Sequence, residues 1–87
     1  SVVRVDYFRN LITNIEKTTP GADGITGVRI AGRVLDPVHR TYGEVAPGAL
    51  VALWGSSGYL EVAIREGSAA AVLGAGRGEP LEAQLGR

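Results

Sequence analysis

Glycine and proline interrupt this chain so often that most of its unbroken runs are too short for a helix. Thirteen glycines and four prolines are spread over 87 residues. Both residue types break regular elements, and the runs between them have the length of strands. We therefore predict an all-β fold, a small antiparallel β-barrel of about seven short strands with at most one short helix.

Alternation of apolar and polar residues locates the strands. Val3 and Val5 alternate with charged neighbours, and Leu60, Val62 and Ile64 are predicted to face one way while the residues between them face the other. The other predicted strands cover 11–15, 25–35, 50–54 and 81–85, with glycine bends at 27 and 32. Loops or turns are predicted at 16–24, 36–39, 55–58 and 76–80, and Ser68 is predicted to cap a helix of one or two turns.

Charge and composition exclude several classes of partner. Nine basic and nine acidic residues give a net charge of zero, which argues against a nucleic-acid surface. The chain has no cysteine and a single histidine, His39, so we expect no disulfide and no metal site. No apolar run approaches the roughly 20 residues of a membrane helix, and no signal peptide is visible. We expect a cytoplasmic protein without a membrane partner.

The start of the chain predicts that it is one domain of a longer polypeptide. Ser1 opens directly into a strand pattern, with no initiator methionine. A domain of 87 residues buries only roughly two-thirds of its unfolded surface, so its stability margin is thin. We expect it to form an oligomer or to lean on another domain.

No catalytic constellation stands out. Ser56, His39 and Glu61 supply the residue types of a triad, but with one histidine and several serines and acids this match carries little weight. The glycine-rich run 74–78 resembles a phosphate loop, yet no helix-forming segment follows to aim its amides. We interpret this run as a hairpin turn.

Three polar segments allow a binding role or a purely structural one. Residues 6–10 place an acid, two aromatics, a guanidinium and an amide directly before a strand, which indicates either a turn held by side chains or a pocket for a planar polar ligand. Ser56 and Ser57 lie between two glycines and could bind a carboxylate or form an ordinary hairpin turn. Tyr42 could stack on a heterocycle or pack at the rim of the core.

These three segments lie in two longer stretches that together resemble one family. "VDYFRNLITNI" (5–15) resembles the signature VD-x-FGN-x-x-TNI of the S-adenosylmethionine (SAM) hydrolases, also called SAM hydroxide adenosyltransferases, which are related to SAM-dependent halogenases. "TYGEVAPGALVALWGSSGYLEVAIREGSAAAVLG" (41–74) resembles their second signature, in the same order and spacing. The resemblance covers nearly the whole chain.

The resemblance implies a domain arrangement. Residues 1–87 match only the C-terminal β-barrel domain of the family, whose catalytic N-terminal α/β domain is absent from this chain. In the family, SAM lies between the N-terminal domain of one subunit and the C-terminal domain of its neighbour in a trimer. The resemblance thus implies SAM or adenosine as ligand, an N-terminal α/β domain as partner, a homotrimer, no cofactor, and no catalytic residue in this chain.

The resemblance also implies roles for individual residues. At the adenine end, Asn10 would read the purine edge, Phe8 would flank the pocket and Tyr42 would stack on the ring. At the methionine end, Asp6 would face the ammonium group, and Ser56 and Ser57 would hold the carboxylate. Glu61 belongs to the motif, and we place it at the amino-acid end of the ligand or at the subunit seam.

One residue departs from the family pattern. The signature has glycine where this chain has Arg9, which predicts either a strained loop conformation or a different loop. The implied reaction is attack of water or hydroxide on the ribose C5′ of SAM, giving adenosine and L-methionine. Two alternatives stay open: a non-catalytic β-barrel module for binding or assembly, and the C-terminal domain of a SAM-dependent halogenase.

Overall fold

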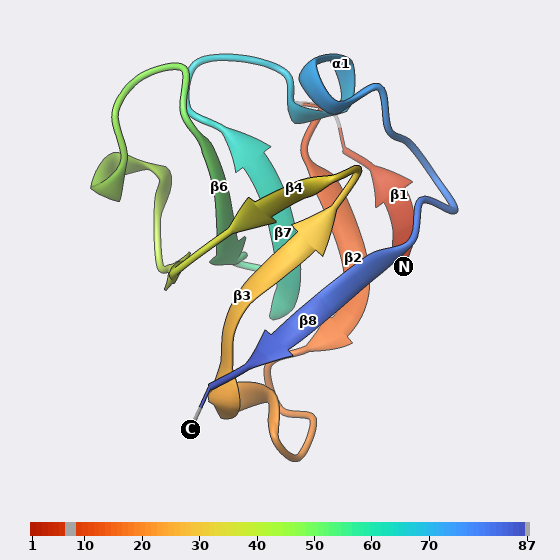
Figure 1. Ribbon diagram of the computed structural model, residues 1–87, viewed down its shortest axis with the longest axis vertical. Helices are drawn as coiled ribbons and strands as arrows, with labels where there is room; N and C mark the ends of the chain where they lie inside the picture. The colour runs from red at the N-terminus through yellow and green to blue at the C-terminus, as the bar shows by residue number, and fades with distance from the viewer. Residues whose placement is uncertain (7–8, 87) are drawn as a thin grey trace.

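The chain folds into two open sheets, so the prediction of a closed barrel is wrong. The computed structural model describes residues 1–6 and 9–86, and within them eight strands and one short α-helix form (Figure 1). The five-stranded sheet has the order β1-β2-β7-β6-β5 and the three-stranded sheet the order β4-β3-β8. All pairings are antiparallel except that of β5 with β6, which is parallel.

The five-stranded sheet consists of β1 (Val2–Val5), β2 (Leu11–Glu16), β7 (Tyr59–Ile64), β6 (Leu50–Trp54) and β5 (Val38–His39). The three-stranded sheet consists of β4 (Arg33–Leu35), β3 (Ile25–Ile30) and β8 (Leu81–Leu85). Two single-turn 3-10 helices, η1 (Ala22–Gly24) and η2 (Tyr42–Glu44), lie in the connections, and α1 (Ala69–Leu73) follows β7.

A closed barrel would need β8 to pair with β1 and β4 to pair with β5, and a proline lies beside each of these places. Pro37 lies between β4 and β5, and Pro80 directly precedes β8. Proline has no N–H to donate, so neither residue can donate a ladder hydrogen bond. The segment before β8 joins β1 through the Val2 N–H, which donates to the Glu79 carbonyl at 3.0 Å, and through the Gly78 N–H, which donates to the Val2 carbonyl at 2.8 Å. The glycine-rich run therefore connects α1 to β8 and is not a hairpin turn.

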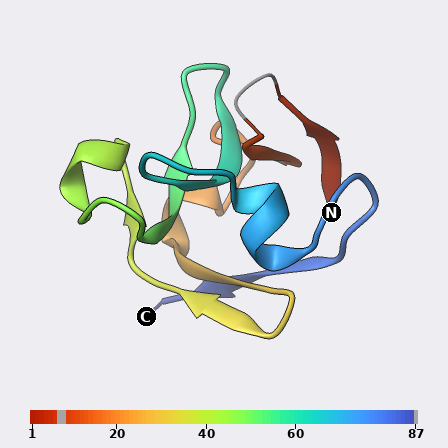
Figure 2. The same ribbon diagram turned by 90° about the horizontal axis from the view of Figure 1, so that it is seen from above.

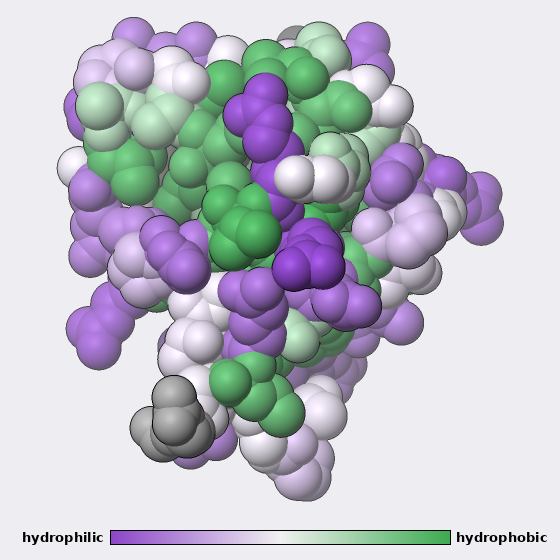
Figure 3. Space-filling view, viewed as in Figure 1, coloured by the Kyte–Doolittle hydropathy of each residue, from purple (hydrophilic) through white to green (hydrophobic). Residues whose placement is uncertain are grey.

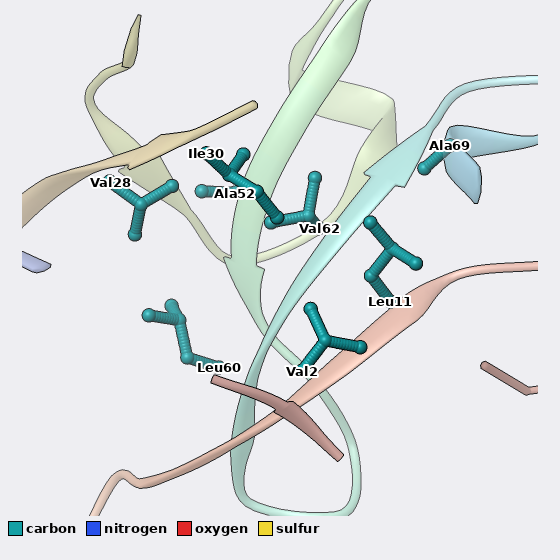
Figure 4. Packing of buried hydrophobic residues seen from close by; sticks show 8 residues of the cluster. All are labelled: Val2, Leu11, Val28, Ile30, Ala52, Leu60, Val62 and Ala69. Atoms are coloured by element: carbon teal, nitrogen blue, oxygen red, sulfur yellow. The ribbon is translucent and has the colours of Figure 1, made fainter. Parts of the chain in front are cut away.

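The core lies between the two sheets and is closed at one end by α1 (Figures 2 and 4). Its buried members are Val2, Leu11, Val28, Ile30, Ala52, Leu60, Val62 and Ala69. Alternation along β7 is confirmed, because Leu60 and Val62 enter this core whereas Ala63 joins Val51 and Leu53 in a second cluster. Since successive strand residues point to opposite faces, this second cluster marks the other side of the five-stranded sheet, which we call the outer face.

The short helix is as expected, while two local predictions are wrong. Ser68 caps α1 by accepting a hydrogen bond from the Ala71 N–H at 3.2 Å. Val2 rather than Val3 is buried, because the ladder is irregular between Val2 and Arg4. Residues 38–39, expected in a turn, form β5 against β6.

The surface over β3, β4 and β8 carries hydrophobic patches broken by charged side chains (Figure 3). It is not a continuous apolar surface. Among the described residues no helix is long and apolar enough to cross a membrane.

Candidate functional site

One row of side chains crosses the outer face of the five-stranded sheet. Cross-strand partners share a face, and the registers place Arg4 beside Ile12, Ile12 beside Glu61, Glu61 beside Leu53, and Leu53 beside His39. The irregularity in β1 turns Arg4 to this face, away from the core that contains Val2. The loop with Asp6 and Asn10 joins two strands of this row, β1 and β2, and the turn with Ser56 and Ser57 joins two others, β6 and β7.

The loop between β1 and β2 is held by Asp6. The Asn10 N–H donates to Asp6 Oδ1 at 2.9 Å, and the Asp6 N–H donates to the Asn10 carbonyl at 3.0 Å. The Arg9 N–H donates to the Asp6 carbonyl, also at 3.0 Å. Asn10 is buried, and Phe8 lies outside the described residues. Asp6 therefore has a structural role, because its carboxylate fixes the end of the loop that carries Asn10.

Arg9 has the strained conformation expected from the family's glycine. Its φ is 65°, in the left-handed region that costs a residue with a Cβ about 1–2 kcal/mol. The Arg9 carbonyl accepts from the Ala70 N–H at 3.2 Å, so the loop is also tied to α1. Arg9 therefore holds this loop conformation at an energetic cost.

Replacing Arg9 by glycine is expected to raise the free energy of unfolding by about 0.5–1 kcal/mol. The left-handed strain disappears, and part of that gain is offset by the larger entropy of glycine in the unfolded chain. Urea denaturation measures the change. The Arg9→Ala variant is the control and should gain nothing, because it keeps a Cβ; equal gains in both variants would contradict the assignment of strain.

The turn between β6 and β7 presents both serines to solvent. The Gly58 N–H donates to the Gly55 carbonyl at 3.0 Å, which closes a turn whose central residues are Ser56 and Ser57. Gly58 has φ 90°, a conformation that favours glycine. Both serines are exposed, so their hydroxyls can meet a ligand without any rearrangement of the core.

Glu61 is a buried carboxyl group in the middle of the row, with an exposed fraction of only 8%. Burial raises the pKa of Glu61, and the nearby negative charge of Asp6 raises it further. The Ser57 side chain and the positive charge of Arg4 act in the opposite direction. The structure thus brings four charged or polar side chains together, Arg4, Asp6, Ser57 and Glu61.

Because the pKa of Glu61 is raised, replacing Glu61 by glutamine is expected to change the stability of the fold in a pH-dependent way. The folded state binds the Glu61 proton more tightly than the unfolded state, so stability falls as pH rises from the ordinary value of 4.5 through the folded pKa. Glu61→Gln should therefore be more stable than the unsubstituted chain at neutral pH, and this difference should vanish below about pH 4. Thermal melts across pH test this; a variant less stable at neutral pH would contradict it.

Tyr42 lies at the other edge of the sheet. It begins η2, which follows the edge strand β5, and η2 and β1 stand on opposite sides of the molecule (Figures 1 and 2). The Tyr42 side chain lies outside the described part of the structure. Val45, shortly after it, packs on Val51, Leu53 and Ala63, so this segment returns to the outer face.

The Ser-His-acid triad is not assembled. His39 Nδ1 lies 3.2 Å from Glu44 Oε1, and the Arg40 N–H donates to the same oxygen at 2.8 Å. These bonds hold the pKa of Glu44 below its usual value, chiefly through the Arg40 backbone. Glu61 has Ser57 as its neighbour instead. Within residues 1–6 and 9–86 no group of three acids or histidines is arranged to hold a metal ion.

A pocket of about 320 Å³ opens beside the row, over β1, β2 and β7. Its lining residues are Val3, Arg4, Ile12, Thr13, Asn14, Ser57 and Tyr59. Sequence reasoning did not select Arg4 as a site residue. The only signal was its charge inside a strand pattern, and the irregularity that turns it to the outer face is not visible in the sequence.

Comparisons of this chain with known families and known proteins point to the same family. The SAM hydroxide adenosyltransferase C-terminal domain family matches residues 1–82. The (R)-S-adenosyl-L-methionine hydrolase of Thermus thermophilus is 44% identical over 80 residues, which are 92% of this chain and 29% of that protein. The chain thus spans under a third of this curated relative.

Two solved structures have the same fold. A conserved hypothetical protein from Thermus thermophilus aligns with a TM-score of 0.80 and 42% identity, over 95% of this chain and 33% of the other. An uncharacterized conserved protein from Thermotoga maritima aligns with a TM-score of 0.74 and 31% identity, over 95% of this chain and 34% of the other. With its motifs, fold and matched range in agreement, this chain belongs to the SAM hydroxide adenosyltransferase C-terminal domain family.

Proposed function

We propose that this chain is the substrate-recognition domain of a two-domain enzyme that hydrolyses SAM to adenosine and L-methionine. The observation that carries the proposal is the family match over residues 1–82, together with a curated hydrolase at 44% identity. Because the chain covers 29% of that relative, the remaining length is available for a catalytic N-terminal domain. In the proposed homotrimer, each SAM lies between that domain of one subunit and this domain of the next.

The methionine end of SAM would meet the region around the 55–58 turn. Its carboxylate would accept hydrogen bonds from the exposed serines Ser56 and Ser57, and its ammonium group would face Asp6. Asp6 would supply the negative charge that the ammonium group meets. SAM carries both an ammonium and a sulfonium group.

The adenine end would be recognised by an amide and two aromatic rings. Asn10 would donate to and accept from the purine edge, Phe8 would flank it, and Tyr42 would stack on the ring. The fixed loop end at Asn10 supports a positional role for this amide.

The contribution of this domain to the chemistry is alignment and exclusion of water. A water or hydroxide oxygen bonds to C5′, the C5′–S bond breaks, its electron pair stays on sulfur, and the nucleophile's proton, when water attacks, goes to solvent. The leaving group departs as neutral methionine because sulfur starts as a cation. Such a displacement needs an in-line geometry more than acid catalysis.

Oxygen-18 water tests the reaction. The complete polypeptide that carries this chain, incubated with SAM in labelled water, should release adenosine with the heavy oxygen at the 5′ position. A 5′-halogenated nucleoside formed in the presence of chloride or fluoride would favour the halogenase alternative. Neither product, with no binding of SAM, would favour a non-catalytic assembly module.

A further inference from the structure

Glu61 has an unusual place for a residue without a chemical role. It is a carboxyl group in the central strand β7, and its cross-strand neighbours on the outer face, Ile12 and Leu53, are buried and apolar. Burying an acid among such residues is unfavourable unless its polar atoms have partners. The partners of Glu61 therefore indicate what the residue does.

The first neighbour of the Glu61 carboxylate is Gly55. A Cβ added to Gly55 would overlap the Glu61 carboxylate. Gly55 does not have the positive φ that would itself demand glycine, whereas Gly58 in the same turn does. Space for the Glu61 carboxylate is thus the structural reason for glycine at position 55. The acid rests directly on the first residue of the turn that presents the two serines.

The second and third neighbours join this turn to the β1–β2 loop. The Ser57 side chain lowers the pKa of Glu61, and the negative charge of Asp6 raises it, so both segments act on this carboxyl group. Asp6 in turn fixes Asn10 through paired hydrogen bonds. Glu61 therefore stands between the two segments, the β1–β2 loop and the 55–58 turn, to which the proposed function assigns Asp6, Asn10, Ser56 and Ser57.

We propose that Glu61 is a positioning residue, which sets the 55–58 turn through the fit of its carboxyl group against Gly55, and does not itself bind the ligand. This role rests on the proposed recognition of the methionine carboxylate by Ser56 and Ser57. In this role Glu61, a residue inside the sheet, determines the conformation of the turn that would bind methionine. It also explains why glycine occupies position 55.

Affinities for SAM and adenosine separate this role from a general loss of structure. In the complete polypeptide, Glu61→Ala is expected to weaken SAM binding about tenfold and adenosine binding less than about twofold, because adenosine lacks the carboxylate that the turn would hold. Glu61→Gln keeps the shape, so it should retain SAM binding. Glu61→Asp keeps the charge but is one methylene shorter, so it should behave like Glu61→Ala. Isothermal calorimetry gives all of these constants.

Each other outcome overturns the role in a distinct way. Equal losses for SAM and adenosine in Glu61→Asp would indicate a purely structural residue. Equal loss of SAM binding in Glu61→Gln and Glu61→Asp would indicate that the Glu61 charge contacts the ligand directly. No binding of SAM or adenosine by the unsubstituted polypeptide would overturn the proposed function as well, which distinguishes the two failures.

A double-mutant cycle tests the contact with Gly55 without any ligand. Gly55→Ala should destabilise the chain when Glu61 is present, because the new Cβ meets the buried carboxylate. In the Glu61→Ala background the same substitution should have little effect, giving a coupling that urea denaturation measures. Strictly additive effects would show that Glu61 does not set the turn.

Discussion

Replacing Leu60 by alanine is expected to lower the free energy of unfolding by about 2–5 kcal/mol, the largest effect of any single truncation we predict. Leu60 is fully buried in β7, the central strand of the five-stranded sheet, and it packs in the core between the sheets (Figure 4). A chain of 87 residues has a total stability of about 4–13 kcal/mol, so the loss removes a large part of it.

Leu85→Ala is the matched control for the cavity that Leu60→Ala would leave in the core. It is also a strand leucine, but 71% of its surface is exposed. Leu85→Ala should change stability by less than about 0.5 kcal/mol. Urea denaturation of both variants gives the comparison, and similar losses would contradict a core located between the two sheets.

Replacing Asn10 by alanine is expected to weaken adenosine binding by about 1–3 kcal/mol, which is roughly 5- to 150-fold. The amide would no longer pair with the adenine edge, while the backbone bonds between Asp6 and Asn10 remain available to hold the loop. Discrimination between adenosine and inosine should fall by a similar factor, since the lost amide is what would distinguish their purine edges. Competition binding with the complete polypeptide measures both quantities.

The control for this prediction is an amide elsewhere in the fold. Gln84 lies on β8 in the three-stranded sheet, away from the outer face. Gln84→Ala should leave the preference for adenosine unchanged. If Asn10→Ala also preserved that preference in a folded protein, Asn10 would be a structural residue of the loop and not a reader of adenine.

Local features of this fold were predictable because they depend on neighbouring residues. Alternation placed Leu60 and Val62 in the core, and the glycines around Ser56 and Ser57 predicted a turn. The family's glycine at position 9 predicted either a strained or a different loop, and Arg9 has the strained, left-handed conformation. Each of these depends on short-range sterics or on a period of two.

Long-range features were not predictable in the same way. Closure of a barrel depends on whether distant edge strands can pair, and prolines at 37 and 80 lie beside both possible ladders. The irregularity between Val2 and Arg4 reverses which valine is buried and turns Arg4 toward Glu61. The cluster of Arg4, Asp6, Ser57 and Glu61 unites two stretches that lie far apart in the sequence, 4–6 and 57–61, so no single motif revealed it.

The recognition role is tested most directly by titrating SAM into the separated N-terminal portion of the complete polypeptide, into this chain, and into an equimolar mixture of both. A ligand site shared between the two predicts saturable binding and release of adenosine in the mixture, with neither partner alone reaching that affinity. Full affinity and turnover by the N-terminal portion alone would contradict it, because this domain would then contribute nothing to recognition.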